Sequence, residues 1–267
     1  MSPAEVGGDP TYAEYLRLDR ILSAQELRSS QHDELLFIVI HQVSELWMRL
    51  SLHELGGARE QIRRDELGPA FKMIARVVRI QEQLIGGWDV LATLTPTDYT
   101  AVRAQLGSSS GFQSHQNRLV EFLLGLKNAG AIAQQRDPQL REALERALVE
   151  PSLYDEAVRL LSRRGFAIPS AAIERDWREP YAPHPEITAA WAQVYRDPSR
   201  WWDLYELAEK LVDLETRYAQ WRFAHLKTVE RIIGGKMGTG GSSGVGYLQA
   251  VVAKRFFPEL VDVRSAL

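Results

Sequence analysis

The sequence predicts an all-α fold, a single-domain helical bundle with long central helices. Apolar residues recur at helical spacing over long segments such as residues 35–55 and 202–221. No segment keeps the alternation and hairpin turns that are typical of β-strands. Since 267 residues are enough for one large hydrophobic core, we expect residues 1–267 to form one domain.

Residues 1–30 are expected to form an N-terminal arm. Prolines and glycines make residues 1–10 irregular, and the apolar segment that follows is too small to bury itself. This segment is either an ordinary amphipathic arm or one that packs on another part of the fold or on a second subunit. Its apolar residues are Tyr12, Tyr15, Leu16, Leu18 and Ile21.

A long, strongly apolar helix is expected over residues 32–62. Ser29 or Ser30 can cap it, and the helix dipole favours Asp33 and Glu34 in its first turn. Its apolar positions are Leu35, Leu36, Phe37, Ile40, Val43, Leu46, Trp47, Leu50 and Leu55.

Two further helices are expected over residues 69–91 and 96–106. Pro69 is a favourable first-turn residue for the first of them. Thr95, followed by a proline and by Asp98, resembles the N-cap of the second. A proline-rich surface segment is expected over residues 165–185. The later helical patterns cover residues 113–126, residues 139–165 with a break near residue 151, a segment from residue 186, residues 198–233 and residues 246–257.

A glycine-rich loop, residues 234–246, follows the last long helix. Seven of its thirteen residues are glycine, and it matches neither the P-loop nor the dinucleotide-binding fingerprint. His225 precedes the loop, four residues after Trp221 on the apolar face of the helix, and is therefore expected to point inward. The loop is either a helix C-cap with a flexible connector or a segment that approaches a ligand through its backbone amides.

The composition argues against several classes of function. A formal net charge of −3 with interspersed signs gives no reason to expect nucleic acid. Without cysteine, the chain has no disulfide, zinc-thiolate site or thiol nucleophile. We find no basic leader with an apolar run and expect no membrane-spanning segment. These observations indicate a soluble, cytoplasmic protein.

Two residue pairs at i,i+4 spacing are candidates for chemistry. Phe37 and His41 share one helix face, and so do Tyr99 and Arg103. His41 is either a hydrogen-bonded core residue or a pocket residue. Arg103 is either a surface residue or a bidentate clamp for a carboxylate, assisted by Tyr99. The chain has no HExxH motif and no strand-borne GxSxG nucleophile elbow. The inward His225 with these two pairs therefore suits a haem with one axial histidine and an amino acid or aromatic acid as substrate.

Three segments closely resemble the tryptophan 2,3-dioxygenase family. They are HDELLFIVIHQVSELWMRLSLHEL (32–55), LTPTDYTAVRAQLGSSSGFQS (94–114) and WRFAHLKTVERIIGGKMGTGGSSGVGYLQ (221–249). The opening TYAEYLRLDRILSAQ and the ending FFPELVDVR are also similar, so the resemblance covers essentially the whole chain. It implies an all-helical fold around haem b. The implied reaction inserts both atoms of O2 across the indole C2–C3 bond of L-tryptophan and gives N-formylkynurenine, the first step of the kynurenine pathway.

The resemblance also implies roles for individual residues. His225 would be the axial ligand of the haem iron, and Trp88, Ser110 and Gly111 would lie beside the haem. In the substrate site, Phe37 would contact the indole ring and His41 would accept the indole N–H. Arg103, Tyr99 and Thr239 would bind the amino-acid end. The resemblance also implies a homotetramer, in which Tyr12 and Tyr15 reach into the site of a neighbouring subunit.

Three residues depart from the pattern that we expect of bacterial family members. They are His115, Asn117 and Met237, and they leave the substrate open between L-tryptophan and a substituted indole. One alternative is therefore a haem oxygenase of the same superfamily in specialised metabolism, which acts on a substituted indole or inserts one oxygen atom. Another alternative is a non-catalytic haem-binding sensor, which does not require the substrate-binding residues.

Overall fold

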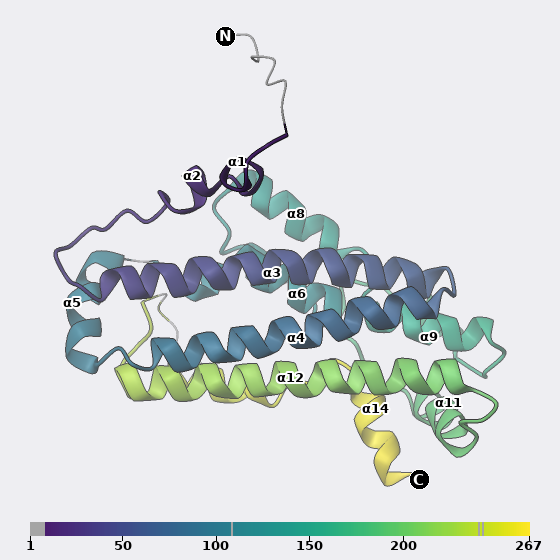
Figure 1. The fold of residues 1–267 in the computed structure, drawn as a ribbon. Coiled ribbons are helices and arrows are strands. Elements are labelled where there is room, and N and C mark those ends of the chain that lie inside the picture. The colour runs from purple at the N-terminus through teal and green to yellow at the C-terminus, as the bar shows by residue number, and fades with distance from the viewer. Residues whose placement is uncertain (1–8, 108, 240, 242) are drawn as a thin grey trace.

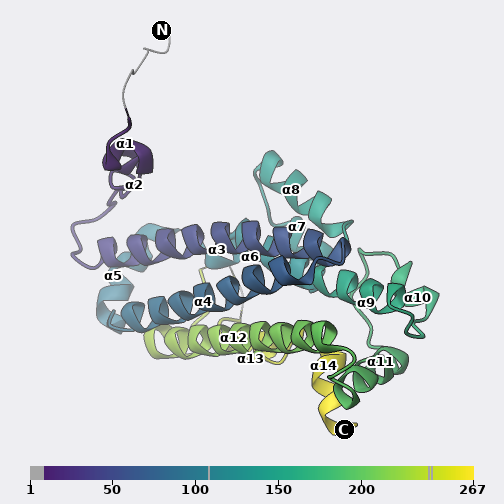
Figure 2. The same cartoon turned by 45° about the vertical axis from the view of Figure 1, so that its right-hand side comes forward.

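The computed structural model describes residues 9–107, 109–239, 241 and 243–267, and no strand occurs among them. Three long helices, α3 (Glu34–Arg63), α4 (Leu67–Leu91) and α12 (Trp202–Ile233), form one layer (Figure 1). In both views α4 lies between α3 and α12 (Figure 2). The predicted all-α class with long central helices is confirmed.

The remaining helices surround this layer. α5 (Pro96–Leu106) lies at one end of it, and α9 (Leu153–Arg163) and α11 (Pro185–Arg196) lie at the other (Figure 1). α6 (His115–Leu124) packs on α3, and α13 (Val245–Val252) packs on α12. The others are α1 (Tyr12–Leu16), α2 (Leu18–Ile21), α7 (Ala129–Ile132), α8 (Pro138–Leu148), α10 (Ser170–Ile173) and α14 (Pro258–Asp262), with the 3-10 helices η1 (Gly111–Gln113) and η2 (Val263–Ser265).

The main hydrophobic core lies where the long helices meet α9 and α11. Trp191 of α11 and Tyr154 of α9 are almost completely buried in it. Each large apolar side chain buried there stabilises the fold by about 1.5–3 kcal/mol. The long helices contribute Leu55, Ala58, Ile62, Leu67, Ala70, Ile74, Val77, Leu204, Leu207, Leu211 and Leu214.

The start of α3 differs from the prediction. Neither Ser29 nor Ser30 caps the helix, because the N-cap position is occupied by Asp33, whose side chain makes no capping hydrogen bond. Ser29 instead donates to the Glu34 carboxylate, through its hydroxyl at 2.6 Å and its backbone N–H at 2.8 Å. The hydroxyl bond is the main reason why the pKa of Glu34 is lowered. These bonds fix the incoming chain on the first turn of α3.

Among the described residues, prolines lie at the first helical positions of α5, α8, α11 and α14. α5 begins as predicted, because the Thr95 hydroxyl accepts from the backbone N–H of Asp98 at 3.3 Å and a proline follows Thr95. The prediction of one final helix over residues 246–257 was wrong. α13 ends at Val252, and Pro258 opens the separate helix α14. The fixed φ of proline suits the first turn of a helix, so Pro258 begins a helix where we expected it to end one.

One face of α3 is apolar and exposed. By length and composition this helix is apolar enough to cross a membrane, contrary to our expectation, and little of its most apolar stretch is buried within the chain. Glu54 further along α3 is buried and pairs with Arg76 of α4. We therefore interpret α3 as a helix of the bundle with one exposed apolar face, formed by Leu35, Val39, Val43 and Leu46.

A buried carboxylate joins the C-terminal helix to the rest of the fold. Glu259 of α14 is fully buried and accepts hydrogen bonds from the hydroxyls of Tyr154 at 3.0 Å and Tyr181 at 2.6 Å. The backbone N–H of His184 donates to the same carboxylate at 3.0 Å. Since these donors come from α9 and from the loop before α11, one side chain holds three separate segments together.

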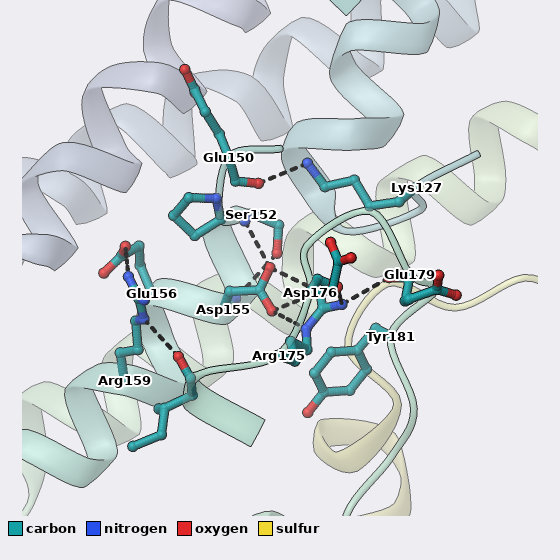
Figure 3. Close-up of polar contacts among 12 residues, drawn as sticks. Lys127, Glu150, Ser152, Asp155, Glu156, Arg159, Arg175, Asp176, Glu179 and Tyr181 are labelled. Carbon is teal, nitrogen blue, oxygen red and sulfur yellow. Dashed lines mark hydrogen bonds and ion pairs between the residues drawn. The ribbon is translucent and has the colours of Figure 1, made fainter. Parts of the chain in front are cut away.

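A second buried carboxylate, Asp155, organises the loop after α9 (Figure 3). Asp155 and Ser152 form a capping box at the start of α9. The Arg175 guanidinium donates to both oxygens of Asp155, at 2.9 and 3.1 Å from Nη2. A further nitrogen of Arg175 donates to the Glu179 carbonyl at 2.8 Å. This arginine therefore holds the loop of residues 174–184 against α9.

Replacing Arg175 with methionine is expected to destabilise the protein by about 3 kcal/mol, because it leaves the buried Asp155 carboxylate without its cation. Arg178→Met is the matched control, since Arg178 pairs with Asp176 in the same loop but both side chains are exposed. The control is expected to change the free energy of unfolding much less. Urea denaturation measures both variants, and equal losses would contradict this assignment.

Candidate functional site

A cavity of about 470 Å³ lies at the end of the layer that carries α5. This volume is within the range of small-molecule binding sites. Helices α3, α4, α5, α6, α12 and α13 line it, together with the segment of residues 109–114 and the glycine loop. Much of its wall is apolar. The sequence-predicted residues in its lining are Phe37, His41, Trp88, Tyr99, Ser110, Gly111, His225 and Thr239.

His225 lies in the cavity wall one turn after Trp221. Its ring stacks on the Trp88 indole, with 4.4 Å between ring centroids and 5° between ring planes. Burial, and to a smaller extent the nearby His41, lowers the pKa of His225 to about 4. The imidazole is therefore neutral at pH 7 and keeps a nitrogen lone pair that can coordinate a metal. The Trp88 Nε1 is buried and has no hydrogen-bond partner among the described residues.

His41 offers an acceptor to the same cavity. Its Nδ1 lies 2.7 Å from the carbonyl oxygen of Phe37, one turn earlier in α3. A carbonyl oxygen only accepts, so Nδ1 carries the proton. Burial lowers the pKa of His41, which favours the neutral ring. In that form Nε2 is an acceptor, suited to an N–H group of a ligand, and the Phe37 ring lies beside it with 4.2 Å between centroids.

Arg103 lies beside the cavity, and its side chain is not part of the lining. Its Nη2 donates to the backbone carbonyl of Met237, in the glycine loop, at 2.7 Å. Its Nη1 is buried and has no partner within the described part of the chain. Tyr99, one turn earlier, does line the cavity, and burial raises the pKa of its hydroxyl. Arg103 thus contacts the loop through one nitrogen and retains another donor for an acceptor.

Two loops form part of the cavity wall. The Ser110 hydroxyl accepts from the backbone N–H of Phe112 at 3.4 Å, which fixes the turn into η1. Thr239 and Gly244 bring the glycine loop to the wall. Gly244 has a φ of +61°, and a Cβ atom there would lie only 2.7 Å from the Lys236 carbonyl oxygen. The loop path therefore requires glycine at position 244.

Tyr12 and Tyr15 do not line this cavity. Both lie on α1 and are 77% exposed. α1 and α2 lie apart from the long-helix layer in both views (Figures 1 and 2). The predicted position of the two tyrosines in a neighbouring subunit's site concerns an assembly and stays a prediction.

Part of the cavity wall is charged, which was not predicted from the sequence. Arg118 and Glu121 form an ion pair on α6, and the Arg222 Nη2 lies 3.7 Å from the Glu121 carboxylate. All three residues line the cavity. Arg222 precedes His225 by three residues, so helical spacing could have placed it near the site. The contact of Arg222 with Glu121 on α6 depends on how the helices pack, so the local sequence does not predict it.

Comparisons with known proteins agree on one family. Residues 3–148 and 131–267 match the family described as tryptophan 2,3-dioxygenase. A protein named tryptophan 2,3-dioxygenase from Erythrobacter litoralis (strain HTCC2594) is 58% identical over 260 residues, 97% of this chain and 99% of that protein. Proteins of the same name from Bacillus thuringiensis (strain Al Hakam) and Ralstonia pickettii (strain 12J) are each 55% identical over 258 residues, 96% of this chain and 92% and 93% of theirs.

Gly244→Ala is expected to displace the glycine loop, because the positive φ and the contact with the Lys236 carbonyl cost about 1–3 kcal/mol. We expect the amides of residues 236–239 to exchange hydrogen on the order of tenfold faster in this variant. Gly246→Ala is the control, since a Cβ atom there meets only the Ser243 hydroxyl at 3.4 Å. Unchanged exchange in the Gly244 variant would show that the loop tolerates a side chain.

Proposed function

The chain belongs to the tryptophan 2,3-dioxygenase family, and from this premise we propose how its cavity serves that activity. The reaction is the insertion of both atoms of O2 across the indole C2–C3 bond of L-tryptophan to give N-formylkynurenine. One observation carries the assignment of the site: two neutral histidines, His225 and His41, face the same largely apolar cavity.

The residues of the cavity fit haem b. The neutral imidazole of His225 would supply a nitrogen ligand for the iron, and its stacking on Trp88 would fix the orientation of the imidazole ring. The buried Trp88 Nε1 has no hydrogen-bond partner in the described chain and would donate to a carboxylate of the haem. Ser110 and Gly111 would lie beside it. When bound, haem supplies the redox chemistry with O2 that amino-acid side chains lack.

The chain would bind and orient the substrate at the other cavity residues. The Phe37 ring would contact the indole, and His41 Nε2 would accept the indole N–H, because Nδ1 of His41 is already engaged. His41 would orient the ring without removing the proton, since an indole N–H is a very weak acid.

The amino-acid end of the substrate would lie toward α5 and the glycine loop. Arg103 would bind the carboxylate, with help from the Tyr99 hydroxyl and Thr239. A loop closed over the substrate would also exclude water. Fixing both ends of the substrate lowers the entropic cost of reaching the reactive orientation.

We propose that the chain assembles with copies of itself, as a homotetramer. Tyr12 and Tyr15 are each 77% exposed on a short arm, and α3 exposes an apolar face nearby in the chain. Such apolar surfaces are typical of protein interfaces. In the assembly, the tyrosines would complete the site of a neighbouring subunit. We further propose that residues 1–267 act as one haem-binding domain and that the enzyme works in the cytoplasm.

The test of the reaction is a mass spectrum of the product. The haem-loaded, reduced protein is given L-tryptophan and isotopically labelled O2. We expect N-formylkynurenine with two labelled atoms. One labelled atom, or turnover of a substituted indole without turnover of tryptophan, would support the specialised-metabolism alternative. Haem binding without turnover of any indole would support the sensor alternative.

Arg103→Leu is expected to weaken binding of L-tryptophan roughly 10- to 100-fold, because it strands the substrate carboxylate. Tryptamine, which lacks that carboxylate, should bind the variant and the unaltered protein about equally. Gln105→Leu on the exposed side of α5 is the control. Equal affinity of the Arg103 variant and the unaltered protein for L-tryptophan would refute the role of Arg103.

A further inference from the structure

A second, much smaller void lies in the interior among α3, α4, α6 and α12. Its volume is about 10 Å³, roughly the space that the centre of one water molecule needs. Three of its residues, Met48, Asn117 and Trp221, also line the main cavity. The remaining lining consists of Ser51, Gln81, Leu84, Val120 and Tyr218.

Two oxygen atoms in this lining have no hydrogen-bond partner in the described chain. They are the Ser51 Oγ and the Gln81 Oε1, on residues that are 1% and 2% exposed. A buried hydroxyl or amide without a hydrogen bond costs roughly 1–3 kcal/mol. Two such groups at one small void, on two different helices, point to a shared partner that is not a side chain.

Asn117 and Tyr218 add polar groups to the same wall. The Tyr218 hydroxyl donates to the Asn117 Oδ1 at 3.0 Å, which leaves a lone pair on the tyrosine oxygen. Each of the four surrounding helices therefore contributes a polar side chain to the void, and the rest of the lining consists of Met48, Leu84, Val120 and Trp221. Internal water molecules in proteins typically make about three such hydrogen bonds.

We propose that this void is the binding site of a single internal water molecule. The water donates one hydrogen to the Gln81 Oε1 and accepts the hydroxyl hydrogen of Ser51. Its second hydrogen is directed to the Tyr218–Asn117 pair. In this arrangement the Ser51 Oγ and the Gln81 Oε1, which have no partner in the described chain, each form a hydrogen bond with the water.

The water has a structural consequence for the main cavity. Asn117 belongs to both walls, and its backbone is fixed by the Ser114 cap at the start of α6. Water behind its side chain, together with Tyr218, holds the amide in place at the cavity wall. This inference concerns the interior between four helices and does not depend on which ligand the main cavity takes.

A high-resolution crystal structure of the haem-loaded protein tests the site directly. We expect one density peak within about 2.6–3.2 Å of the Ser51 Oγ and the Gln81 Oε1. The same peak should remain in crystals under xenon pressure, because xenon prefers dry, apolar voids. A void without density, or one that xenon fills, would overturn the proposal.

A double-mutant cycle tests the shared water in solution. Ser51→Ala and Gln81→Met should each lower the midpoint of thermal unfolding, since each removes one partner of the water. The double variant should lose less than the sum of the two, because the water and both polar groups are then gone. In a dry void, Ser51→Ala would instead leave the midpoint unchanged or raise it, and the effects would add.

Ser44→Ala combined with Gln81→Met is the control cycle. The Ser44 hydroxyl lies on the same helix, two turns before Ser51, and already donates to the Ile40 carbonyl at 2.8 Å. Its effect should add to that of Gln81→Met. Additivity in the Ser51 cycle as well would count against the shared water.

Discussion

The stacking of Trp88 on His225 is the contact on which the candidate site depends. It joins α4 to α12 at the cavity, with the two rings nearly parallel. Because the indole covers one face of the imidazole, the ring is withdrawn from water, and its burial lowers the pKa of His225 to about 4. Packing is thus the main source of a neutral, oriented nitrogen donor. The proposed role of His225 as an iron ligand needs both properties.

The two ends of the long-helix layer are stabilised in different ways. At the end near α9 and α11, apolar side chains fill the interior, and the buried carboxylates Asp155 and Glu259 hold loops and the C-terminal helix. At the other end, the same helices enclose a cavity, and α3 exposes an apolar face to the outside. The well-packed end therefore fixes the helix positions, and the open end is available for ligands and, as we propose, for other subunits.

Local sequence patterns predicted the helices well, because their signals lie within a few residues of each other. Thr95 and Asp98 form the predicted N-cap, and His225 faces inward as its spacing from Trp221 indicates. The failures at Ser29 and Pro258 involve residues with two favourable uses. Ser29 donates to the Glu34 side chain instead of capping α3, and Pro258 begins a helix instead of ending one.

The contact of Glu121 with Arg222 and the network around Asp155 connect segments far apart in the chain. The hydrophobic periodicity of the sequence does not predict such contacts. The resemblance to a family supplied the candidate residues of the site, whereas the second void could be found only from the packing of four helices.

Arg103 lies where it can contact both the glycine loop and a ligand carboxylate. One of its nitrogens donates to the Met237 carbonyl in the glycine loop, and another is buried without a partner in the described chain. A guanidinium is planar and rigid, so a carboxylate bound at one edge restricts the orientation of the other edge. If Arg103 binds the substrate carboxylate as we propose, substrate binding and the position of the loop depend on the same side chain. This coupling uses only the backbone of residue 237, so the methionine there is compatible with it.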